Sequence, residues 1–179
     1  MAFRVTRYAL TPPRWPAGLR LRAVVLSDIH ACWPWMTGSR IERIVEQANV
    51  LEADVVLLLG DFVNAVKVLG LSVPHPDFAH PLARLSAPLG VHAVLGNHDW
   101  SDDEEAVRRG AGPTGAGEAL EAVGIPVYHN RAVRLEHDTG GFWLAGLESQ
   151  RAFWLPRRER SRKNHFRGLD DLDGTLAQV

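Results

Sequence analysis

The sequence predicts an α/β fold built around a parallel sheet. Three stretches rich in aliphatic residues read as buried strands, over residues 21–26, 54–59 and 91–95. Helical spacing of apolar residues fills the interval between the first two, and a short helix is expected before the third. Strand, helix, strand, helix, strand is the order typical of a parallel sheet, and continuous apolar strands predict a sheet that is covered on both faces. A chain of 179 residues fits one domain.

The first half of the chain supplies these elements in order. Residues 1–18 are read as an extended lead-in, because the prolines within residues 12–16 fix φ and disfavour helix. Residues 39–51 carry apolar side chains at helical spacing, with Ser39 as the expected N-cap. A short helix around Pro81 is expected over residues 78–85.

The second half predicts shorter elements. Residues 101–104 resemble a capping box that opens a helix, and residues 118–123 predict a further helix that Gly124 ends. Shorter strands are expected at residues 127–128, 132–135 and 142–147. Residues 151–167 are strongly basic: they could attract a phosphorylated substrate or anionic lipid, but such runs are more often solvated loops.

Charge and cysteine content limit the kinds of partner and the cell compartment that can be expected. The formal net charge is −1 and the isoelectric point about 6.7, so no nucleic-acid partner is expected. One cysteine, Cys32, rules out an internal disulfide and fits a reducing compartment. Residues 1–10 contain no apolar stretch of signal-peptide length. We therefore expect a cytoplasmic protein, with peripheral membrane contact and oligomeric state left open.

Polar segments follow each of the three predicted strands, where open α/β sheets bind their ligands. Asp28 and His30 follow the first strand, Asp61 the second, and Asn97, His98 and Asp99 the third. Alone, the first pair fits a turn aspartate beside a surface histidine better than a metal site, and Asp61 fits a helix N-terminus or a solvated loop as well as it fits a metal ligand. In the third segment the amide oxygen of Asn97 can bind a cation. His98 can protonate a leaving group or stabilise the transition state at phosphorus, and Asp99 can orient an imidazole by a hydrogen bond. Together the segments predict a metal site for phosphate chemistry.

In this order, Asp28-x-His30, Gly60-Asp61 and Gly96-Asn97-His98-Asp99 resemble the calcineurin-like metallophosphoesterase superfamily. Residues 19–30 and 166–172 are similar to its bacterial phosphodiesterase-type branch. The resemblance implies a metallophosphoesterase-type α/β sandwich with two divalent ions, of manganese, iron or zinc. By position, Asp28 and His30 would bind the first ion, Asp61 would bridge both, and Asn97 would bind the second.

The resemblance also implies the reaction. Water activated by the two ions would hydrolyse a phosphodiester or pyrophosphate bond in a small-molecule or lipid substrate, with His98 close to the phosphate. Asn64-Ala65-Val66 stands where protein Ser/Thr phosphatases of the superfamily have Asp-Arg-Gly, which disfavours a protein phosphatase. Trp33 and Trp35 are weak candidates for contact with an apolar substrate or a membrane; the alternative is that they cap the core.

One departure from the family pattern bears on activity. The family completes its site with a histidine after a later strand and then a Gly-His-x-His segment. This sequence has neither, because His129, His137 and His165 remain but none has the right setting. Residues 19–179 are therefore expected to be the N-terminal portion of a single metallophosphoesterase domain, with a sandwich incomplete at the C-terminus. The alternative is a non-catalytic remnant, or a partial metal-binding module that needs further chain or a partner.

Overall fold

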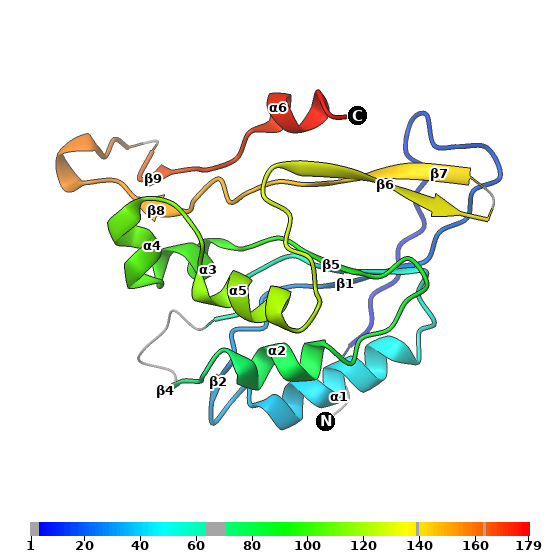
Figure 1. The fold of residues 1–179 in the computed structure, drawn as a ribbon, viewed down its shortest axis with the longest axis horizontal. Coiled ribbons are helices and arrows are strands. Elements are labelled where there is room, and N and C mark those ends of the chain that lie inside the picture. Colours follow the sequence, from blue (N-terminus) through cyan, green and yellow to red (C-terminus); the bar gives the residue numbers. More distant parts are fainter. Residues whose placement is uncertain (1–3, 64–70, 139, 163) are drawn as a thin grey trace.

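The centre of the molecule is a three-stranded parallel sheet. The computed structural model describes residues 4–63, 71–138, 140–162 and 164–179. The sheet has the order β1-β3-β5, with β1 (Ala23–Leu26), β3 (Val55–Leu58) and β5 (Val91–Ala93). The middle strand is the most deeply buried, as its unbroken aliphatic sequence requires. The predicted α/β fold is confirmed, and all three strands direct their carboxyl ends to the same edge (Figure 1).

Two helices pack together below the sheet in Figure 1: α1 (Gly38–Asn49) and α2 (Pro76–Leu82). Helical spacing in α1 buries Ile41, Val45 and Ala48, which confirms the predicted helix. The expected N-cap at Ser39 is wrong. The helix begins one residue earlier and Thr37 takes the N-cap position, so Ser39 lies within the first turn.

Three short helices follow β5: α3 (Asn97–Ser101), α4 (Glu104–Arg109) and α5 (Gly115–Ala122). The predicted capping box at residues 101–104 is wrong, because Ser101 is the last residue of α3. The cap of α4 is Asp103, whose side chain accepts a hydrogen bond of 2.8 Å from the Ala106 backbone N–H.

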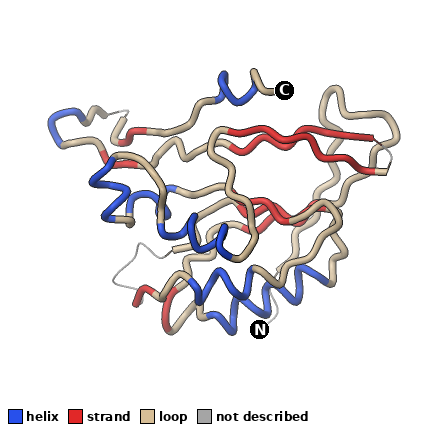
Figure 2. Tube along the Cα trace, viewed as in Figure 1, coloured by secondary structure: helices blue, strands red, loops and turns tan. Residues whose placement is uncertain are grey.

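The remaining strands form antiparallel pairs, and Figure 2 draws these, like all strands, as red parts of the tube. Strands β6 (Arg131–His137) and β7 (Gly140–Gly146) form a long ribbon above the sheet. The other pairs and short helices are β2 (Cys32–Trp33) with β4 (Leu71–Ser72), β8 (Phe153–Trp154) with β9 (Phe166–Arg167), η1 (Arg157–Glu159) and α6 (Leu172–Leu176). The solvated loop expected over residues 151–167 is thus partly wrong, since β8 and β9 pair there.

The core joins the sheet to its helices. Val56 and Leu58 of β3 pack with Phe62 and Phe78, whose rings stack at a centroid distance of 5.7 Å. Trp100 of α3 and Leu120 of α5 are also fully enclosed. This packing fixes the loops at the carboxyl ends of the strands. In the described part of the chain, no helix has both the length and the apolar character that crossing a bilayer requires.

Candidate metal centre

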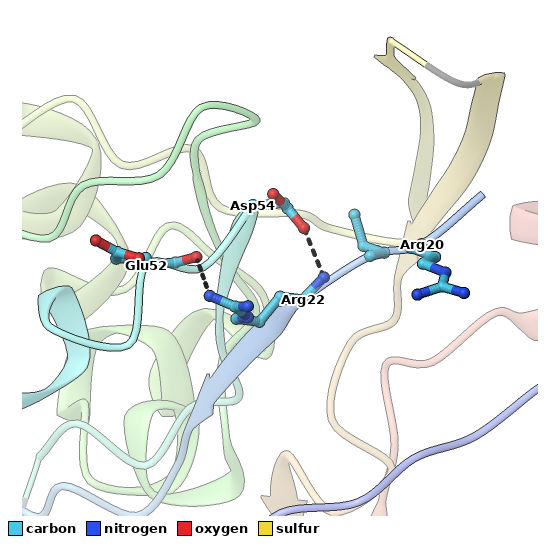
Figure 3. Close-up of a pocket in the computed structure, with 5 residues that line it drawn as sticks. Arg20, Arg22, Glu52 and Asp54 are labelled. Atoms are coloured by element: carbon cyan, nitrogen blue, oxygen red, sulfur yellow. Dashed lines mark hydrogen bonds between the residues drawn. The ribbon is translucent and has the colours of Figure 1, made fainter. Parts of the chain in front are cut away.

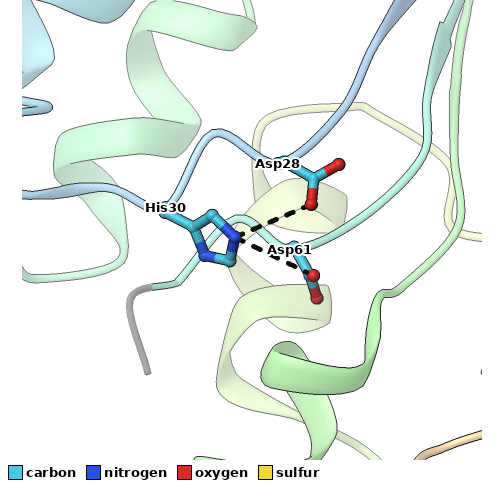
Figure 4. Close-up of side chains that lie close together, drawn as sticks. All are labelled: Asp28, His30 and Asp61. Atoms are coloured by element: carbon cyan, nitrogen blue, oxygen red, sulfur yellow. Dashed lines mark ion pairs between the residues drawn. The ribbon is translucent and has the colours of Figure 1, made fainter. Parts of the chain in front are cut away.

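The structure brings together three of the predicted ligands, Asp28, His30 and Asp61, from the loops after β1 and β3 (Figure 4). His30 Nε2 lies 3.7 Å from Asp28 Oδ1 and 3.9 Å from Asp61 Oδ2. One ligand atom from each residue falls within 4.8 Å of the others. Carboxylate oxygens and an imidazole nitrogen at such spacings suit one divalent ion bound at about 2.0–2.2 Å from each ligand.

All three residues adopt left-handed backbone conformations. The φ angles are 56° at Asp28, 46° at His30 and 56° at Asp61. Such angles cost non-glycine residues about 1–3 kcal/mol each and persist only where the surroundings impose them. The two loops impose them here by pairing: the Asp28 N–H donates to Gly60 O at 3.1 Å, and the His30 N–H donates to Asp61 O at 2.9 Å. Strain concentrated at three neighbouring polar residues is typical of a functional site.

The tautomer of His30 follows from its second ring nitrogen. His30 Nδ1 lies 2.9 Å from the carbonyl oxygen of Val63. Because a carbonyl only accepts, Nδ1 carries a hydrogen, and Nε2 is the ring nitrogen that would bind a metal ion beside the two carboxylates. A metal-binding histidine is oriented in this way by a backbone carbonyl.

Two glycines allow the loops after β3 and β5 to touch. A Cβ at Gly60 would lie 2.0 Å from Gly96 N, and a Cβ at Gly96 would lie 2.1 Å from Asp61 Oδ1. The close approach lets the His98 backbone N–H donate to Asp61 Oδ1 at 2.9 Å. The helix that carries His98 therefore fixes the Asp61 carboxylate directly.

The structure gives Asp99 partners that differ from the expected imidazole. Its buried carboxylate accepts hydrogen bonds from four backbone N–H groups: those of Asp61 and Phe62 at 2.8 Å, of Gly96 at 2.9 Å and of Val63 at 3.2 Å. Burial raises the pKa of Asp99 to about 6, with the Asp61 charge adding to the rise and the N–H donors opposing it. Asp99 thus ties the Asp61 loop to the start of α3.

His98 lies beside His30, with ring centroids 5.3 Å apart in an edge-on arrangement. Its Nδ1 is buried without a hydrogen-bond partner, and the nearest acidic atom is Asp102 Oδ2 at 3.7 Å. A buried unpaired nitrogen is costly, which fits a site where a bound ligand completes the contacts. Asp102, not Asp99, is the carboxylate next to this imidazole. Asp102 is not among the residues predicted from the sequence, although its i, i+4 spacing from His98 is a signal that could have indicated it.

The other candidates lie near the same edge of the sheet. Asn97 is half-buried and begins α3, immediately before His98. Trp33 in β2 and Trp35 are 59% and 62% exposed, so the alternative that they cap the core is wrong. Asn64, Ala65 and Val66 lie outside the described residues.

A surface depression at the opposite, amino end of β1 and β3 is a poor candidate for the site (Figure 3). Two of its charged side chains are already engaged: the Arg22 N–H donates to Asp54 Oδ2 at 2.6 Å, and the Arg22 guanidinium donates to the carbonyls of Leu51 and Glu52 at 3.1 and 3.2 Å. These contacts hold the start of the sheet together.

Comparison with known proteins agrees with this geometry. A transmembrane protein with a metallophosphoesterase domain from Danio rerio is 33% identical over 138 residues, which cover 75% of this chain and 28% of the relative. An uncharacterized metallophosphoesterase from Aquifex aeolicus is 31% identical over 98 residues, covering 54% and 35%. UDP-2,3-diacylglucosamine pyrophosphatase LpxG from Chlamydia trachomatis is 35% identical over 99 residues, covering 55% and 29%.

This chain spans less than half the length of each of the six curated relatives found. No solved structure matches it. The family model for calcineurin-like phosphoesterases, however, matches residues 21–170, which include both strand-end loops and α3. On that match the chain belongs to the calcineurin-like phosphoesterase family of metal-dependent phosphoric ester hydrolases.

Proposed function

We propose that this protein hydrolyses a phosphodiester or pyrophosphate bond with the help of two divalent metal ions. The observation that carries the proposal is the convergence of Asp28, His30 and Asp61, with Asp61 tied to the helix that bears His98. Acidic and imidazole ligands beside a second, unpaired imidazole are the parts that metal-assisted attack of water on phosphorus needs.

Two ions would share these ligands. Asp28, His30 and Asp61 would hold the first and Asp61 and Asn97 the second, as their order in the family pattern implies. When bound, such ions, of manganese, iron or zinc, would supply an activated water and neutralise charge on the phosphate. Asp61 is suited to bind both ions, because its Oδ2 faces His30 and its Oδ1 faces the start of α3.

His98 acts at the phosphate in this proposal. Its imidazole can donate a proton to the leaving group or a hydrogen bond to a phosphate oxygen. Asp102 Oδ2 lies 3.7 Å from Nδ1 and is placed to orient the imidazole for either role. Asp99 acts through the backbone: it holds the Asp61 loop and α3 in register, and so positions Asp61 without touching the substrate.

The substrate is a small-molecule or lipid phosphoester. LpxG, named as a UDP-2,3-diacylglucosamine pyrophosphatase, is among the relatives. Trp33 and Trp35 follow His30 by three and five residues and are largely exposed, so they can contact an apolar part of such a substrate. We further propose a cytoplasmic location with peripheral membrane contact, supported by the single buried cysteine.

Manganese-dependent hydrolysis of bis(4-nitrophenyl) phosphate tests this function. Asp61→Asn keeps the size of the side chain and removes its charge, so both hydrolysis and manganese binding should be lost. Asp138→Asn, at the exposed turn after β6, makes the same chemical change as a matched control and should leave both unchanged. Full activity in Asp61→Asn would show that the bridging assignment is wrong.

A second variant separates chemistry from metal binding. His98→Ala should lower turnover by about 10²–10⁴-fold, the usual contribution of a positioned acid, while manganese still binds. Turnover unchanged from the wild type would remove His98 from the mechanism.

One observation favours a second candidate function, that of a metal-binding module without catalysis. Within the described ranges, Asp28, His30 and Asp61 form the single group of three or more acidic, histidine or cysteine ligands, enough for one ion. Calorimetric titration with manganese distinguishes the two functions. Two ions per chain together with hydrolysis support the enzyme, and one ion without hydrolysis supports the module.

A further inference from the structure

The β8–β9 hairpin has two different faces. Phe153 is buried and packs edge-on against Trp100 of α3, with ring centroids 5.7 Å apart. The next residue, Trp154, points the opposite way because side chains alternate along a strand, and it is 57% exposed. It pairs across the hairpin with Phe166. One face therefore anchors the hairpin to the helix that bears His98, while the other presents aromatic rings to solvent.

Arginine side chains stack on the exposed face. The Arg151 guanidinium carbon lies 4.3 Å from the Phe166 ring centroid, and that of Arg160 lies 5.2 Å from the Trp154 ring centroid. The two rings contact each other at 4.3 Å. A guanidinium over a ring keeps N–H donors in its plane free, and these fit phosphate oxygens. The Arg160 Nε–H donates a hydrogen bond to the Leu155 carbonyl, which orders the side chain further.

Charge in the chain is concentrated on this segment. Residues 151–167 contain seven arginines and lysines against one glutamate, a formal charge of +6, whereas the whole chain has −1. Glu159 pairs with Arg158 at 3.4 Å, and that arginine remains 86% exposed. Arg157 and Arg162 are also exposed. A cationic hairpin on an otherwise acidic protein attracts an anionic surface selectively at this position.

The hairpin lies at the same end of the long axis as β2, β4 and α3 (Figure 1). That end also carries Trp33, in β2, and Leu71, in β4, which is 69% exposed. The cationic segment and these apolar side chains therefore share the end of the molecule toward which the carboxyl ends of the sheet strands point. Tryptophan beside arginine is the combination found where proteins meet the headgroup region of a bilayer.

We propose that the β8–β9 hairpin is a docking site for an anionic lipid bilayer, with lipid phosphates bound by Arg151, Arg160 and the exposed arginines of residues 157–162. Trp154 enters the interfacial layer beside them. A single-stranded nucleic acid is a poorer fit, because Trp154 and Phe166 contact each other in a tilted arrangement and each ring lies beside a guanidinium, which covers ring surface that bases would need.

Co-sedimentation with lipid vesicles tests the proposal independently of catalysis. The wild-type chain should bind vesicles of equimolar phosphatidylcholine and phosphatidylglycerol, release them at high salt, and bind pure phosphatidylcholine vesicles far more weakly. Each basic residue at an anionic surface contributes roughly a fivefold gain in binding, so the triple variant R157Q/R158Q/R162Q should bind about 100-fold more weakly. Trp154→Ala should also weaken binding.

The matched control is R7Q/R20Q/R43Q, which removes the same charge from exposed arginines of the lead-in, of the segment before β1 and of α1. It should reduce binding only slightly, since these residues lie outside the hairpin. Equal losses in both triple variants would overturn the proposal, because binding would then follow net charge alone. Absence of vesicle binding by the wild type would also overturn it, as would tight binding of a fluorescent oligonucleotide in place of vesicles. Unchanged thermal unfolding of the variants shows that they remain folded.

Discussion

Replacing Gly96 with alanine should damage the metal site more than it damages the fold. The new Cβ would lie 2.1 Å from Asp61 Oδ1 and 2.4 Å from the Asp61 backbone nitrogen. Nonbonded atoms of this size settle at about 3.5–4.0 Å, so the Asp61 loop must move by roughly 1 Å or more. Overpacking of this kind costs about 1–3 kcal/mol of unfolding free energy.

The effect on the metal should be larger, because metal–ligand distances hold to about ±0.2 Å. Changes to residues that only support a metal ligand weaken affinity by about 10–100-fold, and here the ligand itself is displaced. We therefore expect manganese affinity, measured by calorimetry, to fall by about 100-fold or more.

Gly124→Ala is the matched control. A Cβ there meets no atom within 4 Å, although its φ of +84° carries a left-handed backbone cost of about 1–2 kcal/mol. Its unfolding temperature should fall while its manganese affinity stays at the wild-type value. Wild-type affinity in Gly96→Ala would refute the argument that the close approach of the two loops sets the position of Asp61.

Two further predictions concern the supports of the site. Asp99→Ala leaves four backbone N–H groups without their acceptor, which costs about 1–3 kcal/mol of unfolding free energy for each one that stays buried. Amide hydrogen exchange at residues 61–63 should therefore accelerate. Unchanged exchange would contradict the view that Asp99 holds this loop in place. His129 Nδ1 bonds the buried Glu148 carboxylate, which raises the pKa of His129 above its usual value, so the stabilisation is present at low pH and lost as pH rises through the raised pKa. Thermal unfolding between pH about 6 and about 9 should show this loss in the wild type and not in His129→Gln; partial exposure of the imidazole keeps the effect small.

The local sequence pattern alone predicted the strands of the central sheet, the first helix and the candidate metal ligands. The aliphatic runs predicted β1, β3 and β5 to within two residues at each end, because a buried strand needs an unbroken apolar sequence. The helical spacing of Ile41, Val45 and Ala48 predicted α1. The same reasoning placed Asp28, His30 and Asp61 at strand ends, and parallel topology then required them to meet.

Tertiary contacts decided what local pattern could not. Sequence spacing does not reveal which donors fold over a carboxylate, so Asp99 was assigned an imidazole although its partners are chiefly N–H groups nearly forty residues earlier. The short β8–β9 pairing depends on contacts between Trp154 and Phe166, twelve residues apart, and on Phe153 packing against α3. The candidate ligands could thus be predicted from the sequence, whereas the groups that support them depend on which distant segments the fold brings together.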